Sequence, residues 1–270
     1  MRGGDGRRDH ADHDGRLSTV VDAPPPGDDT VPRRAILRTG IATGLVAAGT
    51  AALGGWTGLA GATERRAPAP SDAPADPDAA LARLMRGNRR FVRNRAKHPI
   101  DSEARRQTTA GTQTPFAAIL SCSDSRVPPE IIFDQGLGDL FVVRVAGNIA
   151  GSDEIASLAY AAEHVGVDLI FVLGHEACGA VKTTIAVVEG EAQPGEYATL
   201  TDAIAPAVVS AQRTGATGAG LVEASVEENV RLVAAQVPAR SPGIAAEMRR
   251  REIGVVGGVY HLGSGTVSLV

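Results

Sequence analysis

The sequence has few cysteines and few aromatic side chains, and both scarcities limit what the protein can be. Only Cys122 and Cys178 are cysteines among 270 residues, which excludes a scaffold held together by several disulfides. Phe, Trp and Tyr make up 3% of the chain, so a core must consist mainly of Ala, Val, Leu and Ile. The hydrophobic fraction of 43% and the charged fraction of 21% are ordinary for a chain with a packed core.

The sequence also lacks an excess of positive charge. It has 27 Lys and Arg against 31 Asp and Glu, a net charge of −4, which argues against a nucleic-acid-binding protein. Its glycines match neither G-x-G-x-x-G nor a Walker A loop, so no nucleotide site is indicated. We therefore expect a small-molecule substrate and no nucleic acid as partner.

Residues 1–62 are predicted to be an N-terminal extension that ends in a signal peptide. Arg33 and Arg34 precede residues 39–62, a run of 24 residues without a charge that ends in the small residues Ala-Gly-Ala. This arrangement resembles a twin-arginine (Tat) export signal, although Pro32 replaces the usual Ser or Thr.

Cleavage after Ala62 would make the Tat translocase a partner and export the protein across the bacterial cytoplasmic membrane, to the periplasm, the cell wall or the medium. The uncharged run is long enough to cross a membrane, so an uncleaved signal would act as an anchor instead. An unremarkable flexible segment is the third interpretation. We interpret residues 63–77, rich in Ala, Pro and Asp, as a linker.

Residues 78–270 are predicted to form a single α/β domain with a mainly parallel β-sheet flanked by helices. Nearly continuous apolar strands alternate with helical patterns, which is typical of a parallel sheet covered on both faces. The predicted strands are residues 116–120, 140–145, 169–173 and 253–260, followed by a short last strand. The predicted helices begin at Asp76-Pro77 and continue with a short one near Glu103 and those at 152–164, 180–188 and 222–237.

Residues suited to binding a metal follow two of these strands. Cys122 comes after the first strand, and His175 and Cys178 come after the third, at the strand ends where α/β sheets bind ligands. Two thiolates and an imidazole suit Zn²⁺, and three protein ligands leave a fourth position, as in catalytic zinc sites. A disulfide between the two cysteines is the alternative, which the positions of His175 and Asp124 make less favoured.

Asp124 has two possible roles next to this cluster. It lies two residues after Cys122, so its carboxylate could be the fourth ligand and close the site. Arg126 could instead hold the carboxylate in a bidentate pair and leave the fourth position to a water, whose pKa zinc lowers to about 7. The sequence leaves both arrangements open.

These motifs resemble those of the β-class carbonic anhydrase family. The family pattern C-x-D-S-R matches Cys122, Asp124, Ser125 and Arg126, and G-H-x-x-C-G-A matches the segment from Gly174 to Ala180. The resemblance covers about residues 81–267, with one departure at Val145, where the family often has Asn. Further matching segments are residues 87–91, 127–130, 138–144, 146–148 and 256–260.

The resemblance implies one Zn²⁺ per chain, bound by Cys122, His175 and Cys178, and reversible hydration of CO₂ to bicarbonate and a proton, with zinc hydroxide as nucleophile. It implies that Asp124 and Arg126 form a catalytic dyad, that Asp124 ligates zinc in a closed form, and that Gly179 contributes to substrate binding. A homodimer or homotetramer is also implied.

Three other functions remain open from the sequence. Hydrolysis of carbon disulfide or carbonyl sulfide would use the same fold and metal site, and the shape of the substrate pocket would distinguish it from CO₂ hydration. A non-catalytic exported zinc- or anion-binding module would not need Asp124 and Arg126. An exported interaction domain would use the two cysteines as a disulfide.

Overall fold

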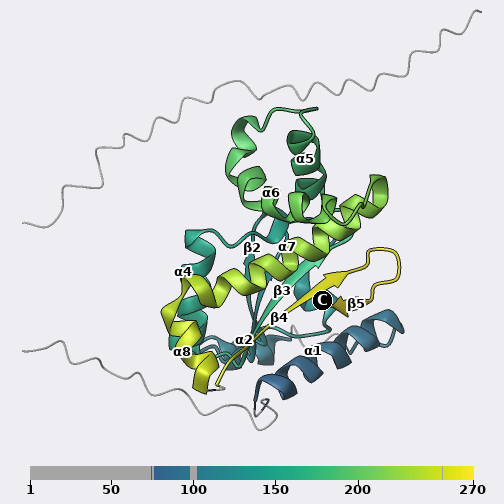
Figure 1. Cartoon of the computed structure of the whole chain (residues 1–270). Coiled ribbons are helices and arrows are strands. Elements are labelled where there is room, and N and C mark those ends of the chain that lie inside the picture. The colour runs from purple at the N-terminus through teal and green to yellow at the C-terminus, as the bar shows by residue number, and fades with distance from the viewer. Residues whose placement is uncertain (1–73, 75, 98–101, 251) are drawn as a thin grey trace, which may run out of the picture. The chain divides into compact units, whose positions relative to one another are not determined.

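The central element of the fold is a five-stranded sheet with the strand order β2-β1-β3-β4-β5 (Figure 1). The computed structural model describes residues 74, 76–97, 102–250 and 252–270. Neighbouring strands run parallel except for the antiparallel pair of β4 and β5, which confirms the predicted α/β class. The strands are β1 (Ala117–Ser121), β2 (Leu140–Arg144), β3 (Leu169–His175), β4 (Gly254–Tyr260) and β5 (Val267–Leu269).

Eight α-helices connect and cover these strands in the described part of the chain. They are α1 (Pro77–Val92), α2 (Glu103–Thr109), α3 (Pro129–Ile132), α4 (Ser152–Tyr160), α5 (Gly179–Val188), α6 (Ala198–Gln212), α7 (Gly218–Arg240) and α8 (Pro242–Arg250). Three short helical turns join them, η1 (Ala146–Asn148), η2 (Ala161–Val165) and η3 (Gly195–Tyr197).

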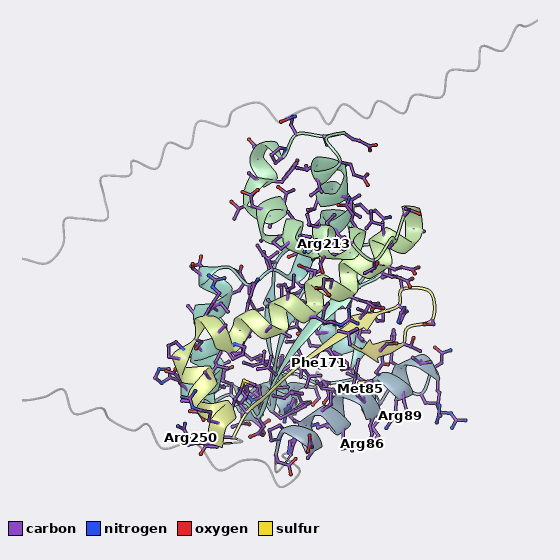
Figure 2. The ribbon with its side chains drawn as sticks, viewed as in Figure 1. Met85, Arg86, Arg89, Phe171, Arg213 and Arg250 are labelled. Carbon is purple, nitrogen blue, oxygen red and sulfur yellow. The ribbon has the colours of Figure 1, made fainter. Side chains whose placement is uncertain are left out.

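Alternate residues of the strands enter two separate cores, one on each face of the sheet. Ala118 and Leu120 of β1 pack with residues from α4 to α8, whereas Ala117 and Ile119 pack with α1 and α3. Side chains along a strand point alternately to opposite faces, so a strand covered on both sides must be apolar throughout. Figure 2 shows the contrast with the outer surface, where Arg86 and Arg89 extend from α1.

Helix α1 is capped at its first turn and joined to other elements near its last turn. Asp76 caps its first turn, with Oδ1 accepting a hydrogen bond of 2.8 Å from the Ala79 amide. Near its other end, the Asn88 side chain donates to the carbonyl oxygens of Ile132 and Gly265 and accepts from the Val267 amide. Asn88 thereby joins α1 to α3 and to the turn that leads into β5.

The predicted elements are present, with differences at their ends and between them. Strand β3 continues through His175, so this histidine is the last residue of the strand and lies within the sheet. Helix α6 was not predicted, because its apolar positions are largely alanine and Pro206 interrupts the pattern. The predicted signal, with Arg33 and Arg34, and nearly all of the linker lie outside the described residues.

Among the described helices, none combines the length and apolar character that a membrane span requires.

Replacement of Gly87 by alanine tests the packing of α1 on α3. A methyl group on Gly87 would overlap the carbonyl oxygen of Phe133, a backbone atom that cannot move independently. We expect Gly87→Ala to lower the free energy of unfolding by about 2–3 kcal/mol, measured by chemical denaturation.

Gly220→Ala is the matched control, because Gly220 also lies in a helix but a methyl group there has open space around it. We expect this variant to be more stable by about 0.4–1 kcal/mol. Equal stability of Gly87→Ala and the unchanged protein would contradict the packing described here.

Candidate metal centre

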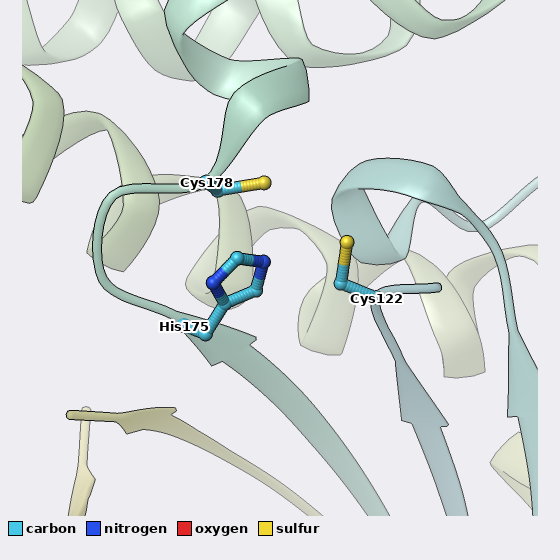
Figure 3. A group of neighbouring side chains, drawn as sticks. All are labelled: Cys122, His175 and Cys178. Atoms are coloured by element: carbon cyan, nitrogen blue, oxygen red, sulfur yellow. The ribbon is translucent and has the colours of Figure 1, made fainter. Parts of the chain in front are cut away.

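Cys122, His175 and Cys178 form one buried cluster at the carboxyl ends of β1 and β3 (Figure 3). Their potential ligand atoms all lie within 4.8 Å of one another. Both cysteines are free thiols in the structure. The three residues therefore lie together, as their positions in the sequence predicted.

The register of the parallel sheet positions two of the three side chains. Ser121 pairs with Leu173, so Cys122, which follows β1, lies level with the last residues of β3. Cys178 returns to the same place because the chain reverses within three residues, with Ala177 in the left-handed region at a φ of 56°. Cys178 is the residue before α5, as predicted, where the helix dipole favours a thiolate.

The His175 ring presents a lone pair to the two thiols. Its Nδ1 atom lies 2.9 Å from the carbonyl oxygen of Glu176. A carbonyl accepts only, so Nδ1 carries the proton and Nε2 is the basic nitrogen. Nε2 is buried and has no hydrogen-bond partner among the residues that the structure describes. An unpartnered basic nitrogen beside two thiols is the environment of a metal ligand.

The donor set fits zinc in chemistry and in size. A tetrahedral zinc with bonds of about 2.0–2.3 Å requires ligand atoms about 3.5–3.8 Å apart. The ligand atoms of the three side chains lie within 4.8 Å of one another, at most about 1 Å beyond the spacing that zinc requires. Small movements of the side chains would therefore bring them onto an ion. Cys122, His175 and Cys178 therefore fit a zinc ion, and a fourth position is left for another ligand.

The two thiols share a hydrogen bond that separates their pKa values. That bond, donated by Cys178, lowers the pKa of Cys122 to about 4, against the opposing effect of burial. The same bond and burial raise the pKa of Cys178, while the amides of Val181 and Ala180 act in the opposite direction. The hydrogen bond between the two thiols therefore favours the thiolate form of Cys122, the form that binds a cation.

Asp124 is held by Arg126 at the edge of the cluster. The Arg126 side chain donates from Nε to Oδ1 at 2.9 Å and from Nη2 to Oδ2 at 2.7 Å, and its amide also donates to Oδ1. Hydrogen bonding to Arg126 is the main reason why the Asp124 pKa lies well below its ordinary value. Oδ2 lies 3.9 Å from His175 Nε2. Of the two arrangements predicted for Asp124, the structure has the pair with Arg126.

Two residues that the sequence did not single out support Cys122. Arg144, the last residue of β2, donates to the carbonyl oxygens of Cys122 and Asp124 at 3.0 and 2.6 Å. The Gly147 amide donates to Cys122 Sγ at 3.3 Å. Their sequence signal was their place in two segments that match the family, residues 138–144 and 146–148, around the carboxyl end of the predicted strand 140–145.

Gly179 is the first residue of α5 and is exposed next to Cys178. A methyl group there would meet no atom within 4 Å, so the backbone at this position has open space around it. Its predicted role in substrate binding stays a prediction.

Sequence comparisons relate the chain to known enzymes. Residues 117–267 match the family model described as carbonic anhydrase. Carbonic anhydrase 2 of Mycobacterium tuberculosis is 40% identical over 195 residues, covering 72% of this chain and 93% of that protein. A carbonic anhydrase of Mycolicibacterium smegmatis is 38% identical over the same shares of both chains.

Solved structures lead to the same family. The β-carbonic anhydrase CcaA matches with a TM-score of 0.55 and 28% identity over 70% of this chain and 94% of its own. A Coccomyxa β-carbonic anhydrase in complex with acetazolamide matches with a TM-score of 0.53 and 28% identity over 70% of this chain and 86% of its own. The chain therefore belongs to the β-class carbonic anhydrase family and is an enzyme of that family, a carbonate dehydratase (EC 4.2.1.1).

Proposed function

We propose that this chain hydrates CO₂ reversibly to bicarbonate and a proton with one zinc ion held by Cys122, His175 and Cys178. The observation that carries the proposal is the unpartnered Nε2 of His175, buried between two free thiols and next to an ionised carboxylate. Zinc bound there lowers the pKa of a water to about 7 and so supplies hydroxide at neutral pH.

Asp124 and Arg126 are the residues that would orient the nucleophile. An ionised carboxylate only accepts hydrogen bonds, so Asp124 would accept one from a nucleophilic water or hydroxide in the site and would orient that nucleophile towards CO₂. Arg126 occupies both carboxylate oxygens and keeps Asp124 out of the ligand position. Arg144 fixes the backbone beneath them through the carbonyl oxygens of Cys122 and Asp124.

Replacement of Arg126 tests this division of roles. We expect Arg126→Ala to retain one zinc per chain, because Arg126 is not in the cluster, and to lose about 100-fold or more in turnover because the nucleophile is no longer oriented. Zinc analysis, a free-thiol count and stopped-flow CO₂ hydration on the same preparation measure these effects.

Two controls accompany this variant. Cys178→Ala should lose zinc and activity together, and Arg89→Ala, an exposed arginine on α1, should change neither. Purified protein without zinc or with a Cys122–Cys178 disulfide would refute the proposed function, and a fully active Arg126→Ala variant would remove the dyad from the mechanism.

No feature of the described residues favours the other functions considered from the sequence. Carbon disulfide and carbonyl sulfide can be assayed on the same preparation, and release of sulfide without CO₂ hydration would replace the proposed reaction. A zinc-loaded protein that is inactive on all three substrates would be a non-catalytic module.

We further propose that the chain forms a homodimer or homotetramer. Support comes from large apolar side chains that are exposed along one edge of the sheet: Ile131 is 59%, Leu137 48% and Tyr160 50% exposed. Ile131 and Leu137 line a cavity of about 660 Å³, and Tyr160 contacts Phe141 of the edge strand β2. A second copy of the chain would cover these side chains.

Ile131→Glu tests this surface, because a charge would have to be buried at the interface. We expect the variant to shift the protein from its oligomer towards the monomer in sedimentation velocity. Tyr197→Glu is the control, since Tyr197 is similarly exposed at 60% but belongs to a different element, the turn η3 just before α6, and is not among the side chains named here. A wild-type monomer, or an Ile131→Glu protein of unchanged size, would refute this interface.

Export by the Tat translocase is a proposal that rests on the sequence of residues 1–62. Replacing both Arg33 and Arg34 by Lys keeps the charge but removes the twin-arginine motif. We expect the double variant to remain in the cytoplasm of its host while the unchanged chain is exported, measured by cell fractionation. Equal distribution of the two would refute the Tat signal, and export without shortening would indicate an anchor.

A further inference from the structure

The turn η1 lies behind Cys122 and has an unusual backbone. Gly147 has a φ of 70° and Asn148, which follows it, has a φ of 43°. Left-handed conformations are unfavourable for residues with a side chain and persist where surrounding structure imposes them. This conformation directs the Gly147 amide to Cys122 Sγ at 3.3 Å. What holds the turn therefore also holds a hydrogen bond to a predicted zinc ligand.

Packing restrains the turn on one side. A methyl group on Gly147 would lie 2.5 Å from Cδ1 of Ile204 in α6 and 3.1 Å from Cβ of Ala180 in α5. These contacts limit how far the turn can move, but they are apolar and do not fix the direction of its peptide groups. A directional contact is needed to fix the backbone of Gly147 and so the two peptide groups on either side of it.

Asn229 supplies that contact from α7, a helix that is distant in sequence. Its Nδ2 atom donates to the Gly147 carbonyl oxygen at 2.9 Å, and the residue is 2% exposed. Its helix neighbours Val226, Val230 and Val233 are buried in the apolar core. A polar side chain within an apolar face is favourable only where it satisfies a buried partner, and here the partner is the turn behind Cys122.

We propose that Asn229 is a positioning residue for the metal centre: it holds the Gly147 carbonyl and thereby restrains the backbone of Gly147, whose amide, in the preceding peptide group, donates to the Cys122 sulfur. This inference rests on the proposed zinc function. The amide hydrogen bond stabilises charge on the sulfur and fixes its direction, and groups that hold metal ligands in this way strongly affect metal affinity. Asn229 does not touch the ion; it acts through Gly147.

Ser225 provides a matched control on the same helix. It lies one turn before Asn229, is 0% exposed, and its hydroxyl has no hydrogen-bond partner among the described residues. Ser225→Ala therefore removes a buried polar group of α7 without removing a contact to the turn. Any general effect of changing the polarity of this helix face should appear in both positions.

The test compares zinc binding by the full chain with Asn229→Ala, Asn229→Leu and Ser225→Ala. Zinc affinity is measured by competition with a chromophoric chelator, and thermal unfolding of the zinc-free proteins shows whether each is folded. We expect both Asn229 variants to bind zinc about 10–100-fold more weakly and Ser225→Ala to be unchanged. In cobalt-substituted protein, the thiolate-to-metal charge-transfer band should shift in the Asn229 variants alone.

The hydrogen bond can also be observed in the unchanged protein. With ¹¹³Cd in the site, the Gly147 amide proton should show scalar coupling to the metal through Cys122 Sγ. Absence of this coupling would overturn the proposal even if no Asn229 variant folds. Folded Asn229 variants with unchanged zinc affinity and an unchanged cobalt spectrum would also overturn it. A wild-type chain that binds no zinc would refute the proposed function instead.

Discussion

The structure depends on one constraint: three side chains at the carboxyl ends of two neighbouring parallel strands must meet in a buried place. The pairing of β1 with β3 sets this, because Ser121 opposite Leu173 brings Cys122 level with the end of β3. Two sulfurs and an imidazole cannot be buried there at low cost unless their charge and hydrogen-bonding groups are satisfied. The hydrogen bonds from Arg144 and Gly147 to Cys122, and the contact of His175 with the Glu176 carbonyl, satisfy part of that need.

Close packing of α7 on the sheet is one consequence. Gly174 in β3 and Gly257 in β4 leave room for Val230, because a methyl group on either glycine would lie 2.5 or 2.6 Å from a Val230 methyl. Any larger residue would push α7 away from the strands. The same close approach brings Asn229 within hydrogen-bond distance of the Gly147 turn. Glycine in the sheet and asparagine in the helix are thus parts of one arrangement.

Much of this architecture could be predicted from the sequence, for physical reasons. The apolar strands had to be buried on both faces, which indicated a parallel sheet, and Asp76 before Pro77 marked the start of α1. Helix α3 was missed because it has four residues and no period to detect, and α6 because alanine gives a weak apolar pattern. The strand order was not predicted, since local patterns do not say which strands are neighbours.

The sequence by itself determined the donor set, because Cys122, His175 and Cys178 are the residue types that zinc prefers and they follow predicted strands. It left the role of Asp124 undecided, since both the metal and Arg126 were within reach. The tertiary structure decided that Asp124 pairs with Arg126, that Arg144 and Gly147 donate hydrogen bonds to Cys122, and that Asn229 donates one to Gly147. The contacts of Arg144, Gly147 and Asn229 join residues from separate elements, and only the folded arrangement of β2, η1 and α7 brings them together.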